Sequence, residues 1–343
     1  MKIFRYSSTV WLLLGMLMIG FFYYGYVTLK SPEVQKKQST QVTHSIVSKE
    51  DSQKEQAVKK KYAIYDDSTI KPVQPEEYVQ AQLNYEKIVN YSGIGAIYIP
   101  SSNIHSKILA GMTNENLMVG LGTYYPEQIL GKGNYVLMAH NLMQGGGVLA
   151  NLPETALGSV VYATDFTTIY EYVVSLNQVV NQSEGDLLNI PDESKTPIMT
   201  IFRCEGGLHT PNRSLIQAEY KRSYPASKGT KKVTENLGLT MITTKASSAK
   251  GTEESEDSQE SGSMSDAINT GTKDSVTIKN SENATSQSIG QNFITTAPPY
   301  SFLQKFSITI FQQFIEFPLL IIFIWLLGMP IFEMLSYYVK NYK

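Results

Sequence analysis

The stretch PIMTIFRCEGGLHTPNRSLIQAEY, residues 197–220, decides the fold. Both of its ends are rich in β-branched and other apolar residues, and Gly, Pro and Asn separate them, which predicts two strands joined by a turn. Cys204, the single cysteine of the chain, ends the first strand, and Arg213 begins the second. A hairpin at this point would bring the Arg213 guanidinium back beside the Cys204 thiol.

Similar strand-like runs recur upstream between clusters of Gly, Pro and Asn: GAIYIP at 95–100, NYVLMAH at 134–140, SVVYATD at 159–165 and TIYEYVVSLNQVV at 168–180. Only two short segments, near 114–118 and 147–151, have a helical pattern. Many short strands with short connections favour an all-β, closed barrel over alternating βαβ units. We expect this barrel to occupy residues 63–224.

The composition excludes several classes of protein. One cysteine in 343 residues rules out an intramolecular disulfide framework and any multi-cysteine metal or iron–sulfur site. The formal net charge of −2 comes from 29 basic and 31 acidic residues, which gives no electrostatic footprint for nucleic-acid binding. We therefore expect no nucleic-acid partner.

Two apolar segments lie near the ends of the chain. Residues 10–29 are uncharged and long enough to cross a bilayer core of about 30 Å, so we predict a transmembrane helix there, with a cleaved signal peptide as the alternative. We predict a second transmembrane helix at 308–335, with an interfacial or re-entrant helix as the alternative. By the positive-inside rule, the basic residues in 1–9 and 336–343 place both termini in the cytoplasm and everything between the spans outside the cell membrane.

Two polar segments connect these parts. Residues 31–61 contain no aromatic residue, and we interpret 30–62 as a solvated extracellular stalk. Residues 225–292 also contain no aromatic residue, and we interpret 225–300 as a disordered linker rich in Ser, Thr and Glu.

The candidates for chemistry are Cys204 and four histidines. Cys204 ends an apolar strand where a permissive Gly loop begins, and functional residues often occupy such places. The alternative is a buried, inert thiol, the commoner fate of a lone cysteine, although a place outside the reducing cytoplasm counts against it. A thiol nucleophile needs a base, and we favour His140, which also ends a strand, over His209 in the Gly- and Pro-containing loop. His44 should be exposed in the stalk, and His105 should be a half-exposed strand residue. Arg213 could stabilise an oxyanion, or simply pair with Glu205 at the surface.

Residues 93–220 resemble the sortases, most closely class A. The matching motifs are GIGAIYIPSSNI, ILAGMTNENLMVGLGTYYPEQILGKGNYVLMAHN, GSVVYATDFTTIYEYVV, TIFRC and NRSLIQAEY, in this order. The resemblance implies an eight-stranded barrel and a membrane-anchored cysteine transpeptidase of Gram-positive surfaces. It implies Cys204 as the nucleophile on the Thr–Gly carbonyl of an LPxTG-type signal, His140 as general acid and base, and Arg213 as stabiliser of oxyanion and substrate. An amine of a lipid II-like cell-wall precursor, or of a pilin, would then resolve the acyl-enzyme.

Two features depart from the family pattern. The family has TLxTC where this chain has TIFRC, so Arg203 could lower the Cys204 pKa, reshape the substrate groove or mark a degenerate binding module; Ala139 and Asn141 beside His140 are weaker candidates for the groove. The second apolar segment is typical of pilin-polymerising class C sortases, whose Asp-Pro-aromatic lid is absent because Ser68 follows Asp66 and Asp67. We therefore expect a class A-like enzyme, with a pilin polymerase as the alternative.

We expect no cofactor and no metal site. Four acidic residues between the last strands could bind calcium, as some sortases do, but they are too spread to define a site: Glu184, Asp186, Asp192 and Glu193.

Overall fold

The computed structural model describes residues 2–46, 48–142, 146–189, 195–206, 210–240 and 293–341. Within these residues, eight strands close into one barrel in the order β2-β3-β4-β5-β8-β9-β7-β6. The strands are β2 (Gly93–Ile99), β3 (Ile104–Leu109), β4 (Leu121–Thr123), β5 (Asn134–Ala139), β6 (Val160–Thr164), β7 (Thr168–Asn181), β8 (Ile198–Cys204) and β9 (Asn212–Pro225). The predicted all-β barrel is confirmed.

The barrel strands carry side chains for two different environments. Alternate residues point to opposite faces of a strand. On β8, Met199 and Ile201 belong to the cluster that fills the barrel interior, whereas Phe202 belongs to a smaller cluster on the outer face. Strand β8 lies between β5, which is parallel to it, and β9, which is antiparallel. The first strand of the predicted hairpin is therefore paired along both of its edges.

Three short helices pack near the barrel: α4 (Pro75–Leu83), α5 (Tyr85–Ser92) and α6 (Asn114–Val119). Helix α6 confirms the helical pattern near 114–118, because Thr113 caps it by accepting a hydrogen bond from the Asn116 N–H. Residues 147–151 form turns instead of a helix, and the sequence did not indicate α4 or α5.

The predicted stalk is wrong as a solvated segment. Residues 30–62 contain α2 (Pro32–Gln41), β1 (Val42–Ser45) and α3 (Lys49–Lys61), which pack on the barrel. Their polar side chains are buried with partners: Gln38 donates to the Tyr300 hydroxyl at 2.9 Å, and Lys59 donates to Glu55 at 2.6 Å and to the Gly93 carbonyl at 2.9 Å. Composition alone misses such a segment, because these buried polar side chains find partners that lie far away in the chain.

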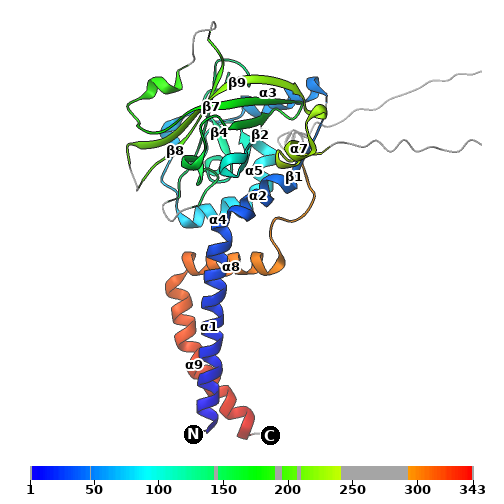
Figure 1. Ribbon diagram of the computed structural model, residues 1–343. Helices are drawn as coiled ribbons and strands as arrows, with labels where there is room; N and C mark the ends of the chain where they lie inside the picture. Colours follow the sequence, from blue (N-terminus) through cyan, green and yellow to red (C-terminus); the bar gives the residue numbers. More distant parts are fainter. Residues whose placement is uncertain are drawn as a thin grey trace, which may run out of the picture.

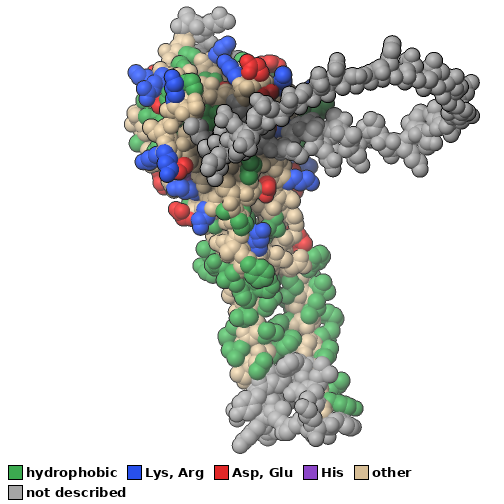
Figure 2. Space-filling view, turned by 90° about the vertical axis from the view of Figure 1, so that its right-hand side faces the viewer, with side chains coloured by type: hydrophobic (Ala, Val, Ile, Leu, Met, Phe, Trp, Pro, Cys, Tyr) green, Lys and Arg blue, Asp and Glu red, His purple; other side chains and the backbone are tan. Residues whose placement is uncertain are grey.

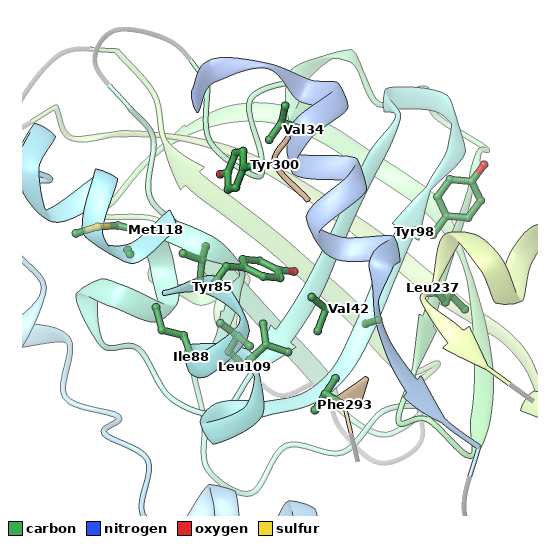
Figure 3. Packing of buried hydrophobic residues seen from close by; sticks show 14 of the residues in the cluster. Val34, Val42, Tyr85, Ile88, Tyr98, Leu109, Met118, Leu237, Phe293 and Tyr300 are labelled. Carbon is green, nitrogen blue, oxygen red and sulfur yellow. The ribbon is translucent and has the colours of Figure 1, made fainter. Parts of the chain in front are cut away.

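A second apolar core forms where this segment meets the barrel (Figure 3). Val34 and Val42 from the N-terminal segment lie in one cluster with Tyr85 and Ile88 of α5 and Leu109 of β3. Phe293 and Tyr300, which follow the long polar region, also belong to it. Segments that precede and follow the barrel in the sequence are therefore part of the folded body.

The predicted linker is also shorter than 225–300. After the 3-10 turn at Ala226–Lys228 come α7 (Lys231–Asn236) and β10 (Leu239–Thr240), and the chain returns as β11 (Phe293–Thr295). A three-stranded sheet of order β10-β1-β11 joins these pieces. The remaining part of the predicted linker, 241–292, lies outside the described residues.

Helix α1 (Lys2–Lys30) contains one candidate membrane span, Thr9–Lys30. The predicted second helix at 308–335 is not continuous: α8 (Phe302–Glu316) and α9 (Pro318–Asn341) meet at a bend of 100°. The bend follows from Pro318, since a proline disfavours the helical conformation at the residue before it, and Phe317 has φ −131° and ψ 52°. In Figure 1, α8 crosses α1 below the barrel and α9 runs beside α1.

Surface chemistry separates the two parts of the molecule. Figure 2 shows acidic and basic side chains on the barrel and a mostly hydrophobic surface on the helices below it. Leu13, Met16 and Ile19 of α1 are 60%, 69% and 63% exposed, and Leu319 of α9 is 80% exposed. Such a continuous apolar surface fits burial in lipid.

Candidate active site

Three residues singled out in the sequence lie in one row across β5, β8 and β9. Cys204 pairs with Arg213 in the β8–β9 register. The β5–β8 register ends with Ala139 opposite Arg203, and His140 and Cys204 are the next residues along these two parallel chain segments. Neighbouring strands lie about 4.8 Å apart, so Cys204 has the histidine on one side and the arginine on the other.

The three side chains share the outer face of the barrel. Cys204 alternates with Arg203 and therefore points to the same side as Phe202, which belongs to the outer cluster. His140 likewise follows inward-facing Ala139 and shares the side of Met138, which packs against the outer cluster. The row therefore faces the outside of the barrel and not its interior.

Cys204 is a free, half-buried thiol at the last position of β8. Directly after it, the Glu205 N–H donates to the Asn212 carbonyl at 2.9 Å, so the hairpin pairing holds both sides of the thiol. Gly206 then takes φ +97°, which favours glycine and lets the chain turn away from the strand. The nucleophile candidate thus stands at the end of a rigid strand, where the loop begins.

His140 is held through both its backbone and its ring. Its N–H donates to the Leu117 carbonyl of α6 at 2.9 Å, and its ring Nε2 lies 3.2 Å from Asn114 Oδ1. Burial lowers the pKa of His140 from 6.5 to about 4. The imidazole is therefore neutral near pH 7, which suits a base that removes a proton from a thiol.

The Arg213 guanidinium is held by neutral oxygens. It donates to the carbonyls of Thr210 and Asn212 at 2.8 and 2.9 Å and to Gln182 Oε1 at 2.8 Å. The alternative ion pair with Glu205 is wrong, because Glu205 pairs with Arg203 at 2.9 Å. Since its bonds go to uncharged acceptors, Arg213 keeps its full positive charge available for an anion.

Arg203 points away from the row. It alternates with Cys204, its side chain is 8% exposed, and its Nη1 donates to the Cys204 carbonyl at 2.9 Å. Ala139, opposite it, is 2% exposed and lies in the interior cluster. Contrary to the suggestion from the sequence, neither side chain lies on the outer face of the barrel. Asn141, the other residue suggested for a substrate groove, is half-buried and directly follows His140.

The other histidines lie apart from the row or outside the described residues. His44, predicted to be exposed, is fully buried and stacks on Phe166 at 3.8 Å, because the segment that carries it packs on the barrel. His105 lies on β3 as predicted, but it is 5% exposed and contacts Asn103 at 3.1 Å. His209, the rival base, lies outside the described residues.

A buried apolar cluster adjoins the row. It lies on the outer face of β5, β7, β8 and β9 and is formed by Val136, Val180, Phe202 and Leu215. Tyr124, Tyr125 and two leucines, Leu187 and Leu188, pack against this cluster.

In the part of the chain that the structure describes, no group of three or more His, Cys, Asp or Glu side chains converges. Asp192 and Glu193 of the calcium candidates lie outside that part. Sequence reasoning missed one residue at the row, Asn114, although the Thr113 cap marks the helix on which it sits.

Comparison with known proteins agrees with this geometry. Residues 97–221 match the model of the sortase domain. The chain is 28% identical to sortase A of Bacillus anthracis over 204 residues, which cover 59% of this chain and 87% of that protein. It is 24% identical to sortase A of Listeria monocytogenes over 168 residues, 49% of this chain and 73% of that protein. A crystal structure of Listeria monocytogenes sortase A superimposes with a TM-score of 0.39 at 24% identity, covering 43% of this chain and 97% of that one.

Proposed function

This chain belongs to the sortase family, a family of cysteine transpeptidases, and we propose that it is a class A-like sortase that cleaves an LPxTG-type signal between Thr and Gly. The observation that carries the proposal is the row of His140, Cys204 and Arg213 on the outer face of the barrel. The row supplies a base, a nucleophile and a fixed cation in the order that acyl transfer needs.

In the acylation step, Cys204 Sγ attacks the Thr carbonyl carbon and its proton passes to His140. The S–C bond forms, the Thr–Gly C–N bond breaks, and His140 returns the proton to the leaving Gly amine. An acceptor amine then gives a proton to His140 and attacks the thioester, and Cys204 leaves and recovers its proton. The product contains a new amide bond, and the enzyme is unchanged.

Arg213 provides the charge for the developing oxyanion. A guanidinium has five N–H donors, and the bonds to Thr210, Asn212 and Gln182 hold its plane in place. A donor that is fixed before the reaction stabilises the transition state more than one that must reorient.

The resting state of His140 is the neutral imidazole. Because burial lowers the pKa of His140 to about 4, the ion pair of thiolate and imidazolium is a minor population near pH 7. We therefore expect modest turnover, with the proton moving during the attack.

The apolar side chains beside Cys204 suit the Leu-Pro part of the signal. Phe202 and Leu215 are buried there, and the partly buried Tyr124 and Tyr125 pack against them. Burial of apolar side chains there would bring the Thr–Gly bond to the row.

We place the barrel outside the cell membrane, with both termini in the cytoplasm. Sortases are membrane-anchored, and α1 is long and apolar enough to be the anchor. In Figure 1 the two chain ends lie at the same end of the α1 and α9 helices, which supports one side for both termini. The acceptor would then be the amine of a cell-wall precursor attached to the membrane.

A second candidate is a pilin polymerase, in which the acceptor is a lysine of another protein. The observation that favours it is α9, which runs beside α1 and could be a second span (Figure 1). Covalent high-mass ladders of surface proteins in cells with the enzyme, and their loss without it, would identify this role.

The test of the proposal uses the full chain in lipid nanodiscs, a labelled LPxTG-type peptide and an amine. We expect amide product from the unaltered chain and none from Cys204→Ala. Equal product from both would reject the proposal. Activity that appears only after Arg203→Thr would instead identify the native chain as a degenerate binding module.

A further inference from the structure

The His140 ring has a fixed neighbour that the catalytic row does not include. Asn114 Oδ1 lies 3.2 Å from His140 Nε2. The same oxygen accepts the backbone N–H of Lys71 at 3.0 Å. Asn114 therefore joins the imidazole to the segment that precedes α4.

These two contacts determine which ring nitrogen carries the proton. A backbone N–H is always a donor, so the Asn114 atom that faces Lys71 must be the amide oxygen. That oxygen accepts only, so the ring nitrogen beside it must donate, which places the proton of the neutral imidazole on Nε2. Nδ1 is then the nitrogen with a free lone pair.

Helix α6 holds the ring from the side away from the nucleophile. Barrel order places β4 and β8 on opposite sides of β5, and α6 leads directly into β4. Leu117 of this helix accepts the His140 backbone N–H, and Asn114 binds the ring. Two contacts from one helix, capped by Thr113, restrict both the position and the rotation of the imidazole.

We propose that Asn114 is a positioning residue, which fixes the His140 imidazole as the Nε2–H tautomer and thereby leaves Nδ1 to accept the proton of Cys204. This inference rests on the proposed function for its catalytic meaning, because only a transpeptidase or hydrolase needs that proton transfer. The hydrogen bond itself is a property of the resting protein.

Other ionisable groups occur on the elements around the ring: Cys204 on β8, Arg213 on β9, Glu115 on α6 and Lys71 before α4. Burial lowers the pKa of His140, so the ring starts in the neutral form that the tautomer argument requires. A carboxylate in place of the Asn114 amide would accept the same hydrogen bonds while adding a negative charge next to Nε2–H.

The kinetic test compares three variants of the full chain with the peptide and amine assay. Asn114→Ala should lower kcat roughly 10- to 100-fold with little change in KM, because the ring can rotate and leave Nδ1 misaligned. Asn114→Asp should keep most of the activity but move the acid limb of the pH profile upward by about one pH unit. Glu115→Ala, an exposed neighbour on the same helix, is the matched control and should match the unaltered chain.

A second readout does not depend on activity. In the chain with ¹⁵N-labelled histidine, ring nitrogen chemical shifts should show His140 as the Nε2–H tautomer, and a mixture of tautomers in Asn114→Ala. An Nδ1–H tautomer in the unaltered chain, or an acid limb that Asn114→Asp does not move, would overturn the proposal. If the unaltered chain cleaves no peptide, the proposed function fails, whereas the tautomer measurement still decides the role of Asn114 in holding the ring.

Discussion

The Arg203–Glu205 ion pair gives an asymmetric prediction, because its two members differ in burial. The Arg203 side chain is 8% exposed and the Glu205 side chain is 34% exposed, with 2.9 Å between them. Arg203 also donates to the Cys204 carbonyl at 2.9 Å. Loss of either charge breaks the pair. When Arg203 is removed, water can hydrate the partly exposed Glu205 carboxylate, whereas when Glu205 is removed, the Arg203 guanidinium stays buried.

We expect Glu205→Gln to be the more harmful change. It leaves a guanidinium buried at the barrel end with a weakened partner, and loss of one member of a buried pair typically costs about 3 kcal/mol or more. Arg203→Met keeps the apolar stem and leaves Glu205 to be hydrated, so it should lose only about 1–2 kcal/mol, mainly from the charged hydrogen bond to Cys204. The double variant should resemble Arg203→Met alone.

The measurement is the midpoint of thermal unfolding for the full chain in nanodiscs, followed by circular dichroism of the barrel. A loss of about 3 kcal/mol corresponds to a fall of roughly 6–12 °C for a domain of this size. Trp11 and Trp325 lie on α1 and α9, so tryptophan fluorescence would report those helices rather than the barrel. The four proteins of the double-mutant cycle give the coupling between the two charges.

Two results would refute this reasoning. Additive effects in the cycle would mean that the charges do not interact. Complete loss of acylation in Arg203→Met, in a protein that is still folded, would mean that Arg203 acts on the thiol directly instead of supporting its strand. We expect acylation within about tenfold of the native rate at 25 °C, because the Arg203 side chain and Sγ point to opposite faces of β8.

Further predictions concern charge. Arg213→Ala should lower kcat of acylation about 100- to 1,000-fold and Arg213→Lys less, measured with the labelled peptide, because the fixed donor to the oxyanion is lost; equal rates would exclude that role. Burial lowers the pKa of both His105 and His140 to about 4. The unfolded chain therefore binds more protons between pH 4 and 6.5, and unfolding midpoints should fall as pH drops through this window; His105→Gln should reduce the slope. Burial lowers the pKa of Lys107 to about 7, so stability should rise from pH 7 to 10.5, and Lys107→Met should flatten this rise.

The barrel could be predicted from sequence because its strands carry a local signal. Runs such as 134–140 and 197–204 combine β-branched and aromatic residues between turn residues, and the register follows from which face is buried. The segment 30–62 carries no such signal. Its burial depends on long-range partners such as Tyr300 for Gln38 and Gly93 for Lys59, which no local pattern indicates.

The proposed catalytic residues were likewise only partly predictable from the sequence. Cys204, His140 and Arg213 each stand at the end of a strand, so a sequence with clear strands places them near turns. That they share one row depends on the parallel pairing of β5 with β8, a contact between residues far apart in the chain. The direction of Arg203 follows from simple alternation once Cys204 is placed outside, whereas the contact of Asn114 with His140 needs the position of α6.

Segments before and after the barrel in the sequence pack against each other, and this packing affects how the barrel is oriented relative to the membrane. A solvated stalk would let the barrel rotate freely, whereas here α1 is followed by α2 after the single residue Ser31. The N-terminal β1 pairs with β11 from the C-terminal part, and Gln38 bonds Tyr300 just before α8. Two helical segments thus leave the barrel from one buried cluster, so the orientation of the Cys204 row relative to α1 is set by side-chain packing and not by linker length.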